Sequence, residues 1–325
     1  MSLGQGPKDP PNLRPVTPFL AAREWTDGAS LDGQVVIVGA PFDATTSFRP
    51  GTRFGPERIR SVSYGLETYS PLLDSHLSPD WLVDLGDLDL PLHDTSRTLA
   101  EIEQAVAWLL DWGGRPLLLG GEHTVSVGAI RAAAKRYPGL VIVQLDAHAD
   151  WREEYLGDRY SHATTLRRAA EAEGVSRVIQ IGIRSGSQEE FAAGRQRGEF
   201  YPGAGVETLV EVGERLARQG VPVYLTIDID VLDPAFAPGT GTPEPGGWTS
   251  GQLLSGLTAW ARSRPFLVGA DLVEISPPVD LADVTSVVGA KITRELALLL
   301  HRTGRRPEGA ARDCAGPGSS SARGG

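Results

Sequence analysis

LVIVQLDAHAD, at residues 140–150, places a strongly apolar run directly before two aspartates and a histidine. A short apolar run rich in β-branched residues predicts a strand buried on both faces, here Leu140–Leu145. Five more runs share this character: Val35–Val38, Pro116–Leu119, Arg177–Ile183, Pro222–Ile227 and Phe266–Val273. Apolar residues at helical spacing lie between them, at Leu99–Leu110, Val125–Arg136, Val206–Arg218 and Ser250–Arg262. Buried strands alternating with helices predict an α/β fold, with three αβα layers around a mostly parallel sheet.

These strands and helices predict one domain from about residue 32 to residue 302, because no Gly/Pro-rich linker divides that stretch. Scattered prolines in residues 1–31 predict an N-terminal extension with little order. Residues 303–325 are rich in Gly, Ser and Arg and predict a flexible tail.

The composition excludes several classes of function. The 325 residues carry a formal net charge of −10, which disfavours binding to nucleic acid or to an anionic membrane. The single cysteine, Cys314, allows neither an internal disulfide nor a thiolate metal cluster. The N-terminus has no signal-peptide core, and no apolar run approaches the roughly 18–20 residues needed to cross a bilayer. We therefore expect a cytoplasmic protein.

Polar clusters follow four of the predicted strands. They are Gly120–His123, Asp146–Asp150, Asp228–Asp230 and Glu274. In open parallel sheets, ligands bind outside the carboxyl ends of the strands. The four clusters are therefore predicted to meet at one edge of the sheet.

The residue types in these clusters predict a metal centre. A single strand-end aspartate is more often a cap or turn residue, and a single histidine is more often structural. Four carboxylates and two imidazoles together would resist ionisation unless cations neutralised them. This set is rich in oxygen and lacks cysteine, so it suits Mn²⁺ better than structural Zn²⁺. Six ligands are too many for one ion with an open position, and they suit two ions about 3.5–4 Å apart.

The sequence resembles the ureohydrolase (arginase/agmatinase) family. The blocks that carry the resemblance are Gly120–Ser126, Asp146–Asp150, Asp228–Gly247, Arg49–Pro56 and Gly269–Glu274. It extends from about Gly39 to Leu299, and the set of blocks is highly specific in this order and spacing. One departure is Glu122, where many members of the family carry aspartate. The resemblance implies the arginase-like fold and a trimeric or hexameric assembly.

The resemblance also implies the roles of individual residues. One manganese ion would be held by His123, Asp146, Asp150 and Asp228, and the other by His148, Asp146, Asp228 and Asp230. A hydroxide bridging the two ions would attack the guanidinium carbon of the substrate. Asp150 and His162 would carry the proton to the leaving amine, and Glu274 would bind the guanidinium with help from Thr242. For His162 a structural role at a helix start remains open, as does a structural role for Arg49–Pro56 as a turn followed by a helix.

The loop after Asp150 is expected to choose the substrate. It contains the acids Glu153, Glu154 and Asp158 and has no Asn, Ser or Thr before Ser161. Acids favour a cationic far end, so the expected reaction is hydrolysis of agmatine to putrescine and urea, with Glu154 among the substrate-binding residues. Arg152 and Arg159 keep guanidinobutyrase open as an alternative. Arginase, or a catalytically silent metal-binding member of the family, are further alternatives.

Overall fold

The computed structural model describes residues 10–303, and its centre is a ten-stranded sheet in the order β1-β6-β3-β7-β12-β11-β8-β9-β10, with β2 also paired to β6. Every pairing in this sheet is parallel except that of β1 with β6. The strands are β1 (Leu13–Arg14), β2 (Arg23–Glu24), β3 (Val35–Ala40), β6 (Leu82–Leu88), β7 (Arg115–Gly120), β8 (Leu140–Leu145), β9 (Val175–Ile181), β10 (Glu199–Tyr201), β11 (Pro222–Asp228) and β12 (Phe266–Val273). A separate hairpin joins β4 (Tyr69–Ser70) to β5 (Ser75–His76).

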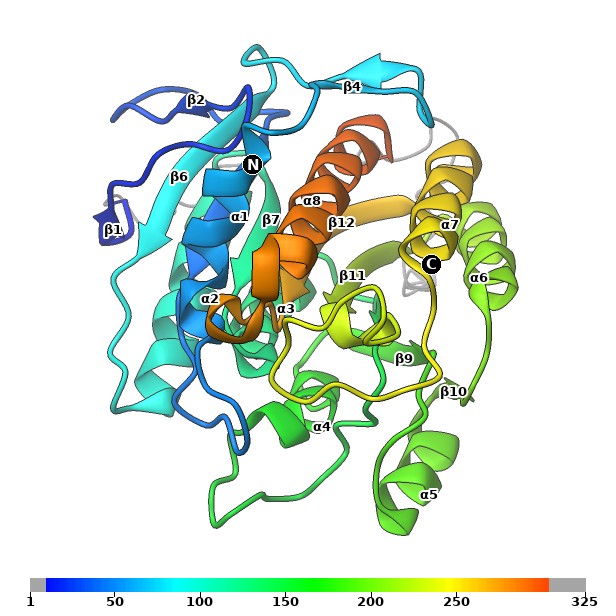
Figure 1. The fold of residues 1–325 in the computed structure, drawn as a ribbon. Coiled ribbons are helices and arrows are strands. Elements are labelled where there is room, and N and C mark those ends of the chain that lie inside the picture. The colour runs from blue at the N-terminus through cyan, green and yellow to red at the C-terminus, as the bar shows by residue number, and fades with distance from the viewer. Residues whose placement is uncertain (1–9, 304–325) are drawn as a thin grey trace, which may run out of the picture.

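Helices cover both faces of the sheet (Figure 1). One layer holds α1 (Gly55–Ser63), α6 (Val206–Gln219), α7 (Ser250–Ser263) and α8 (Val284–Thr303), and the other holds α2 (Thr95–Asp111), α3 (Ser126–Arg136) and α4 (Thr165–Ala170). A further helix, α5 (Gln188–Arg197), precedes β10. The predicted three-layer architecture with a mostly parallel sheet is therefore confirmed.

Alternation along the strands explains the two layers of core. In β8, Val141 and Val143 pack into the core beneath α6, α7 and α8, whereas Leu140 and Ile142 pack toward α2, α3 and α4. Successive side chains of a strand point to opposite faces, so a strand that is apolar throughout feeds both cores. Among the described residues, no helix combines the length and apolar character needed to cross a membrane.

The predicted helices and strands agree with the structure to within a few residues. The runs Leu140–Leu145 and Phe266–Val273 are β8 and β12 as predicted. The block Arg49–Pro56 is indeed followed by a helix, because α1 begins at Gly55 with Pro56 in its first turn. A proline is tolerated there because the first amides of a helix lack partners within the helix.

The N-terminal segment differs from the expectation. The sequence predicts an extension with little order over residues 1–31, but in the described part, residues 10–31, β1 and β2 pair with β6, and Phe19 and Leu31 are fully buried. The prolines of this segment lie outside the two short strands and do not prevent pairing, since an edge strand needs few backbone donors. Thr303 is also packed, as the buried last residue of α8; the rest of the expected tail lies outside the described residues.

Candidate metal centre

Four neighbouring strands deliver the predicted polar clusters to one edge of the sheet. They lie in the order β7-β12-β11-β8, and all four run parallel. Their carboxyl ends are followed by Glu122 and His123, by Glu274, by Asp230 and by Asp146, respectively. The clusters are thus brought together as predicted, although their residues are far apart along the chain.

The ends of β7 and β12 are tied together by close backbone packing. Gly121 N donates to Ala40 O at 2.9 Å, and Glu274 N donates to Gly121 O at 2.8 Å. A Cβ atom on Gly121 would lie only 1.9 Å from Phe42 O, so this position requires glycine. The tight approach fixes where the following His123 enters the cluster.

Five of the six predicted ligands form two overlapping groups, and the sixth, Asp150, contacts His123. His123, Asp146 and Asp228 form one, Asp146, His148 and Asp230 form the other, and the ligand atoms within each group lie within 4.8 Å of one another. His123 Nδ1 is 3.0 Å from both Asp146 Oδ2 and Asp150 Oδ2, and 3.6 Å from Asp228 Oδ2. His148 Nδ1 is 2.9 Å from Asp230 Oδ2. Two groups that share Asp146 suggest a binuclear centre.

The acids of the cluster are buried and repel one another. Burial together with the charges of Asp230 and Asp146 raises the pKa of Asp228 well above its usual range. Burial and the charge of Asp146 raise the pKa of Asp150 to about 7. Burial opposes protonation of His123, but Asp146 and Asp150 outweigh it and raise the pKa of its imidazole. Protons therefore compete for positions that a divalent cation would occupy.

Two buried atoms show that the donor set fits a metal ion. His123 Nδ1 and Asp230 Oδ2 make no hydrogen bond, although Asp146 Oδ2 lies 3.0 Å from the first and His148 Nδ1 lies 2.9 Å from the second. Buried polar atoms of proteins almost always have a partner. Both atoms lie in a cluster of carboxylate oxygens and imidazole nitrogens, which are ligands that Mn²⁺ accepts.

Two of the candidate carboxylates lie on strained backbone. Asp150 has φ 54° and Glu274 has φ 66°, in the left-handed region that residues other than glycine rarely occupy. Such strain costs roughly 1–3 kcal/mol per residue and persists where the surroundings fix it. At both positions it turns a carboxylate back over the end of its strand and into the cluster.

A cavity of about 380 Å³ opens onto the cluster. Its walls include Asp150, His162, Thr242 and Glu274, so the predicted catalytic and substrate-binding residues other than Glu154 lie together. Glu274 Oε1 accepts a hydrogen bond from His123 N at 2.7 Å, which leaves Oε2 free to meet a ligand. Burial, followed by the charge of Glu122, raises the pKa of Glu274 well above its usual range.

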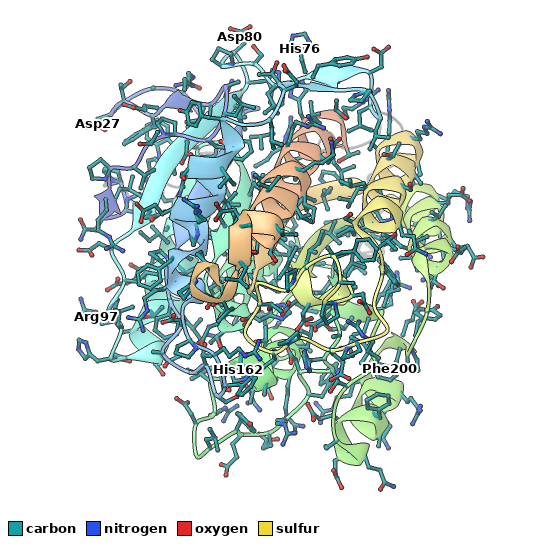
Figure 2. All side chains as sticks on the ribbon, in the orientation of Figure 1. Asp27, His76, Asp80, Arg97, His162 and Phe200 are labelled. Atoms are coloured by element: carbon teal, nitrogen blue, oxygen red, sulfur yellow. The ribbon has the colours of Figure 1, made fainter. Side chains whose placement is uncertain are left out.

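His162 stands in the cavity wall at the end of the molecule where the loops gather (Figure 2). Ser47 Oγ lies 3.3 Å from its Nε2, and Ser161 Oγ lies 3.3 Å from its Nδ1. The ring of Tyr155 meets the imidazole edge to face. Burial lowers the pKa of His162 to about 4, so the ring is neutral near neutral pH. His76, in contrast, lies at the opposite end of the molecule (Figure 2).

The loop after Asp150 is organised differently from the expectation. The carboxylate of Glu153 pairs with Arg167 and Arg168, and Arg159 pairs with Glu171. Glu154 is exposed and is not among the residues that line the cavity, so its contact with substrate stays a prediction. Helix α4 thus holds the carboxylate of Glu153, and none of the three acids of the loop lines the cavity, which the sequence of the loop alone does not reveal.

The acid that faces the cavity in its place is Glu190. It is 4% exposed and belongs to α5, where Ser187 Oγ accepts from Glu190 N and Glu190 Oε2 accepts from Ser187 N at 2.8 Å. Arg152 Nε lies 3.3 Å from Glu190 Oε2, and Arg152 also lines the cavity. The pattern Ser-x-x-Glu at residues 187–190 indicates a capping box at a helix start. Because this capping role explains Glu190 on its own, the sequence gives no sign that Glu190 also lines the cavity.

Comparisons with known proteins agree with this geometry. The sequence model of the arginase family matches residues 33–299. The chain is 50% identical to agmatinase of Bacillus anthracis over 268 residues, which cover 82% of this chain and 92% of that protein. It is 47% identical to agmatinase of Bacillus subtilis over 282 residues, covering 86% of this chain and 95% of that protein. The crystal structure of agmatine ureohydrolase of Thermoplasma volcanium superposes with a TM-score of 0.76 at 32% identity, covering 89% and 95% of the two chains.

Proposed function

Because the chain belongs to the arginase family, we propose that it is an agmatinase, a binuclear manganese hydrolase that cleaves agmatine to putrescine and urea. The observation that carries the proposal is the pair of His/Asp groups sharing Asp146 at the floor of a cavity that also presents Glu274. The similarity to bacterial agmatinases over most of the chain supports agmatine as the substrate.

The ligand sets proposed for the two ions follow the family assignment. His123, Asp146, Asp150 and Asp228 would hold one manganese ion, and His148, Asp146, Asp228 and Asp230 would hold the other. The distances around His123 and His148 support these sets. When bound, two such ions lower the pKa of a shared water and supply hydroxide at neutral pH.

The protein's own residues orient the substrate and move its protons. Glu274 is buried and has one oxygen free, so it would accept the guanidinium through charge-assisted hydrogen bonds. Thr242, in the same wall, would add a neutral hydrogen bond. Asp150 lies beside His123 at the cavity floor and would pass a proton toward the leaving amine. His162 is a neutral imidazole in the wall and would exchange that proton with solvent.

The far end of the substrate would meet Arg152 and Glu190. Agmatine ends in an ammonium group, which Glu190 can accept, and arginine would add a carboxylate beside that acid. Juxtaposed like charges and a poorly solvated anion disfavour the carboxylate by several kcal/mol. We therefore expect agmatine to be preferred to arginine by at least roughly a hundredfold in kcat/KM, equivalent to about 3 kcal/mol.

Guanidinobutyrase is the second candidate activity, and one observation favours it. Arg152 lines the cavity, so its guanidinium could pair with a substrate carboxylate if it left Glu190. The Arg152–Glu190 ion pair could therefore bind a cationic substrate group through Glu190 or an anionic one through Arg152. Whether Glu190 or Arg152 meets the substrate would decide between the two activities.

A panel of three substrates tests the proposal. Urea release by manganese-loaded protein is measured with agmatine, arginine and 4-guanidinobutyrate. Fast release from agmatine alone supports the proposed activity, and a clear preference for 4-guanidinobutyrate supports the second candidate. Equal rates with agmatine and arginine would contradict the role of the Arg152–Glu190 pair. A protein that binds manganese but releases no urea from any of them would be a catalytically silent member of the family.

The assembly and the compartment are also proposals. We propose a cytoplasmic trimer or hexamer, supported by the resemblance to the family. Light scattering coupled to gel filtration measures the mass of the assembly, and a monomer at micromolar concentration would contradict it.

A further inference from the structure

Behind His123, on the side away from the carboxylate cluster, three buried side chains form a continuous line of hydrogen bonds. His123 Nε2 lies 2.9 Å from Thr226 Oγ1, and Thr226 Oγ1 donates to Asp271 Oδ1 at 2.6 Å. Thr226 and Asp271 are completely buried, and His123 is 1% exposed. We call these three residues the buried triad.

The fold holds the triad rigidly. Thr226 lies in β11 and Asp271 in β12, and the two residues are direct partners in the register of these parallel strands. His123 follows β7, the strand on the other side of β12. The triad therefore spans three adjacent strands beneath the metal cluster, where neither solvent nor a flexible loop can replace its members.

The number of protons in the triad fixes the tautomer of His123. A threonine hydroxyl has one proton, and the short distance commits that proton to Asp271, which as a carboxylate can only accept. Ser126 Oγ, the other acceptor near Thr226, is at 3.5 Å and is the weaker choice. Thr226 Oγ1 must therefore accept from His123 Nε2–H. The lone pair of the neutral imidazole then lies on Nδ1, the atom that faces Asp146 and Asp150 without a hydrogen bond.

We propose that Thr226 and Asp271 are positioning residues that hold His123 in the Nε2–H tautomer and aim its Nδ1 lone pair at a metal ion. Hydrogen bonding to a carboxylate through the hydroxyl also makes the imidazole a stronger ligand. Burying the Asp271 carboxylate costs free energy, because it has no ion-pair partner among residues 10–303. Its role in positioning His123 would explain why it is buried there.

The second imidazole of the cluster is held differently. The His148 side chain is 27% exposed and contacts Asp230 through Nδ1, and within the described part of the chain no hydrogen bond to its Nε2 is found. The triad therefore acts on only one of the two histidines. Its loss should weaken one manganese equivalent and spare most of the affinity for the other.

Manganese titration of the metal-free protein by calorimetry tests the proposal. Thr226→Val keeps the shape and removes the hydroxyl, so one manganese equivalent should bind roughly ten- to a hundredfold more weakly. Thr226→Ser restores the hydroxyl and should bind both equivalents as the wild type does. Asp271→Asn keeps an acceptor without the charge and should give an intermediate loss.

A control separates positioning from general loss of packing. Thr293 is completely buried in α8, where its hydroxyl donates to Gly289 O at 2.8 Å. Thr293→Val should lower the melting temperature of the metal-free protein, as Thr226→Val does, but leave manganese affinity unchanged. If Thr226→Val does not fold, the comparison of Thr226→Ser with Asp271→Asn carries the test.

Three outcomes would overturn the proposal. The first is wild-type manganese affinity in Thr226→Val, or in Asp271→Asn if Thr226→Val does not fold. The second is an equal loss of manganese affinity in Thr226→Val and Thr226→Ser. The third is a loss of manganese affinity in Thr293→Val as large as that in Thr226→Val. The inference rests on the proposed metal centre but not on the substrate, because the titration uses none. A wild-type protein that bound no manganese would remove the metal centre and the triad's role together. Manganese binding without urea release would remove only the proposed activity.

Discussion

Asp146 contributes an oxygen to both groups of candidate ligands, and we propose that Asp228 also contacts both ions. Asp228→Asn replaces a charged ligand with a neutral amide between two cations. The variant should lose at least one manganese equivalent and nearly all turnover. Asp230→Asn should mainly weaken one ion, since Asp230 belongs to a single group. Metal analysis of the purified variants measures this, and full manganese content with normal turnover in Asp228→Asn would contradict bridging.

His162 offers a separate test, because it lines the cavity without belonging to either ligand group. His162→Ala should lower kcat by about a hundredfold, the lower end of what general acid–base groups contribute, while manganese content stays the same. Small imidazole buffers should restore part of the rate. His93→Ala, which removes an exposed imidazole elsewhere, is the matched control and should change neither quantity. Undiminished kcat in His162→Ala would leave the residue with only a structural role.

Glu190 is the residue on which substrate choice is expected to depend. Glu190→Gln keeps the capping box of α5, because glutamine also serves at that position, and removes only the charge. The ratio of kcat/KM for agmatine to that for 4-guanidinobutyrate should fall about tenfold or more, as expected for about 1.4 kcal/mol. Arg152, freed from its partner, should favour the carboxylate substrate.

Glu154→Gln is the control for this charge change. Glu154 is exposed and outside the cavity, so its neutralisation should leave the ratio of the two substrates unchanged. A changed ratio in Glu154→Gln with none in Glu190→Gln would restore the interpretation that the sequence of the loop suggested. The convergence of the candidate metal ligands could be predicted from sequence because their strand-end positions bring them together. Glu190 could not, because its capping pattern accounts for it locally.

Among the secondary-structure elements, β6 shows why some of the fold could not be predicted. Its sequence carries Asp84 and Asp87, and aspartates are disfavoured in buried strands. The compensation comes from α1, where Arg60 contacts Asp84 through Nε at 2.8 Å and Asp87 through Nη1 at 2.6 Å. All three residues are buried. No period or propensity within the strand reveals a partner in another element, whereas the wholly apolar β8 and β12 need none.

The Arg60 ion pairs predict a large effect on stability. Arg60→Met leaves two carboxylates buried without a cation, which should cost about 3–5 kcal/mol in the free energy of unfolding. Arg58→Met removes an ion pair between α1 and Asp283, whose side chains are 39% and 34% exposed. That control should cost at most about 1 kcal/mol. Denaturant unfolding compares the variants, and equal losses would contradict the importance of burial.

For the whole molecule, the three αβα layers could be predicted because they follow from the alternation of apolar strands with helices. The edge of the sheet that carries the candidate metal centre could be predicted from where those strands end. The N-terminal start of the packed domain could not be predicted in this way. Residues 10–31 are polar and rich in proline, yet their two short strands lie along β6 at the border of the sheet. Their order comes from partners more than fifty residues later, such as Asp84, which accepts a hydrogen bond from Phe19 N.

The strand order also has a consequence for biosynthesis. β12 is the last strand to leave the ribosome, yet it lies between β7 and β11, in the middle of the sheet. A nascent chain that ends before Phe266 contains all six candidate metal ligands but lacks the strand that joins their two halves. Manganese should therefore not protect such a chain, truncated after Arg264, from protease, although it should protect the full-length protein. Manganese capture is thus expected to follow synthesis of the C-terminal part rather than to guide it, and equal protection of both chains would contradict this order of events.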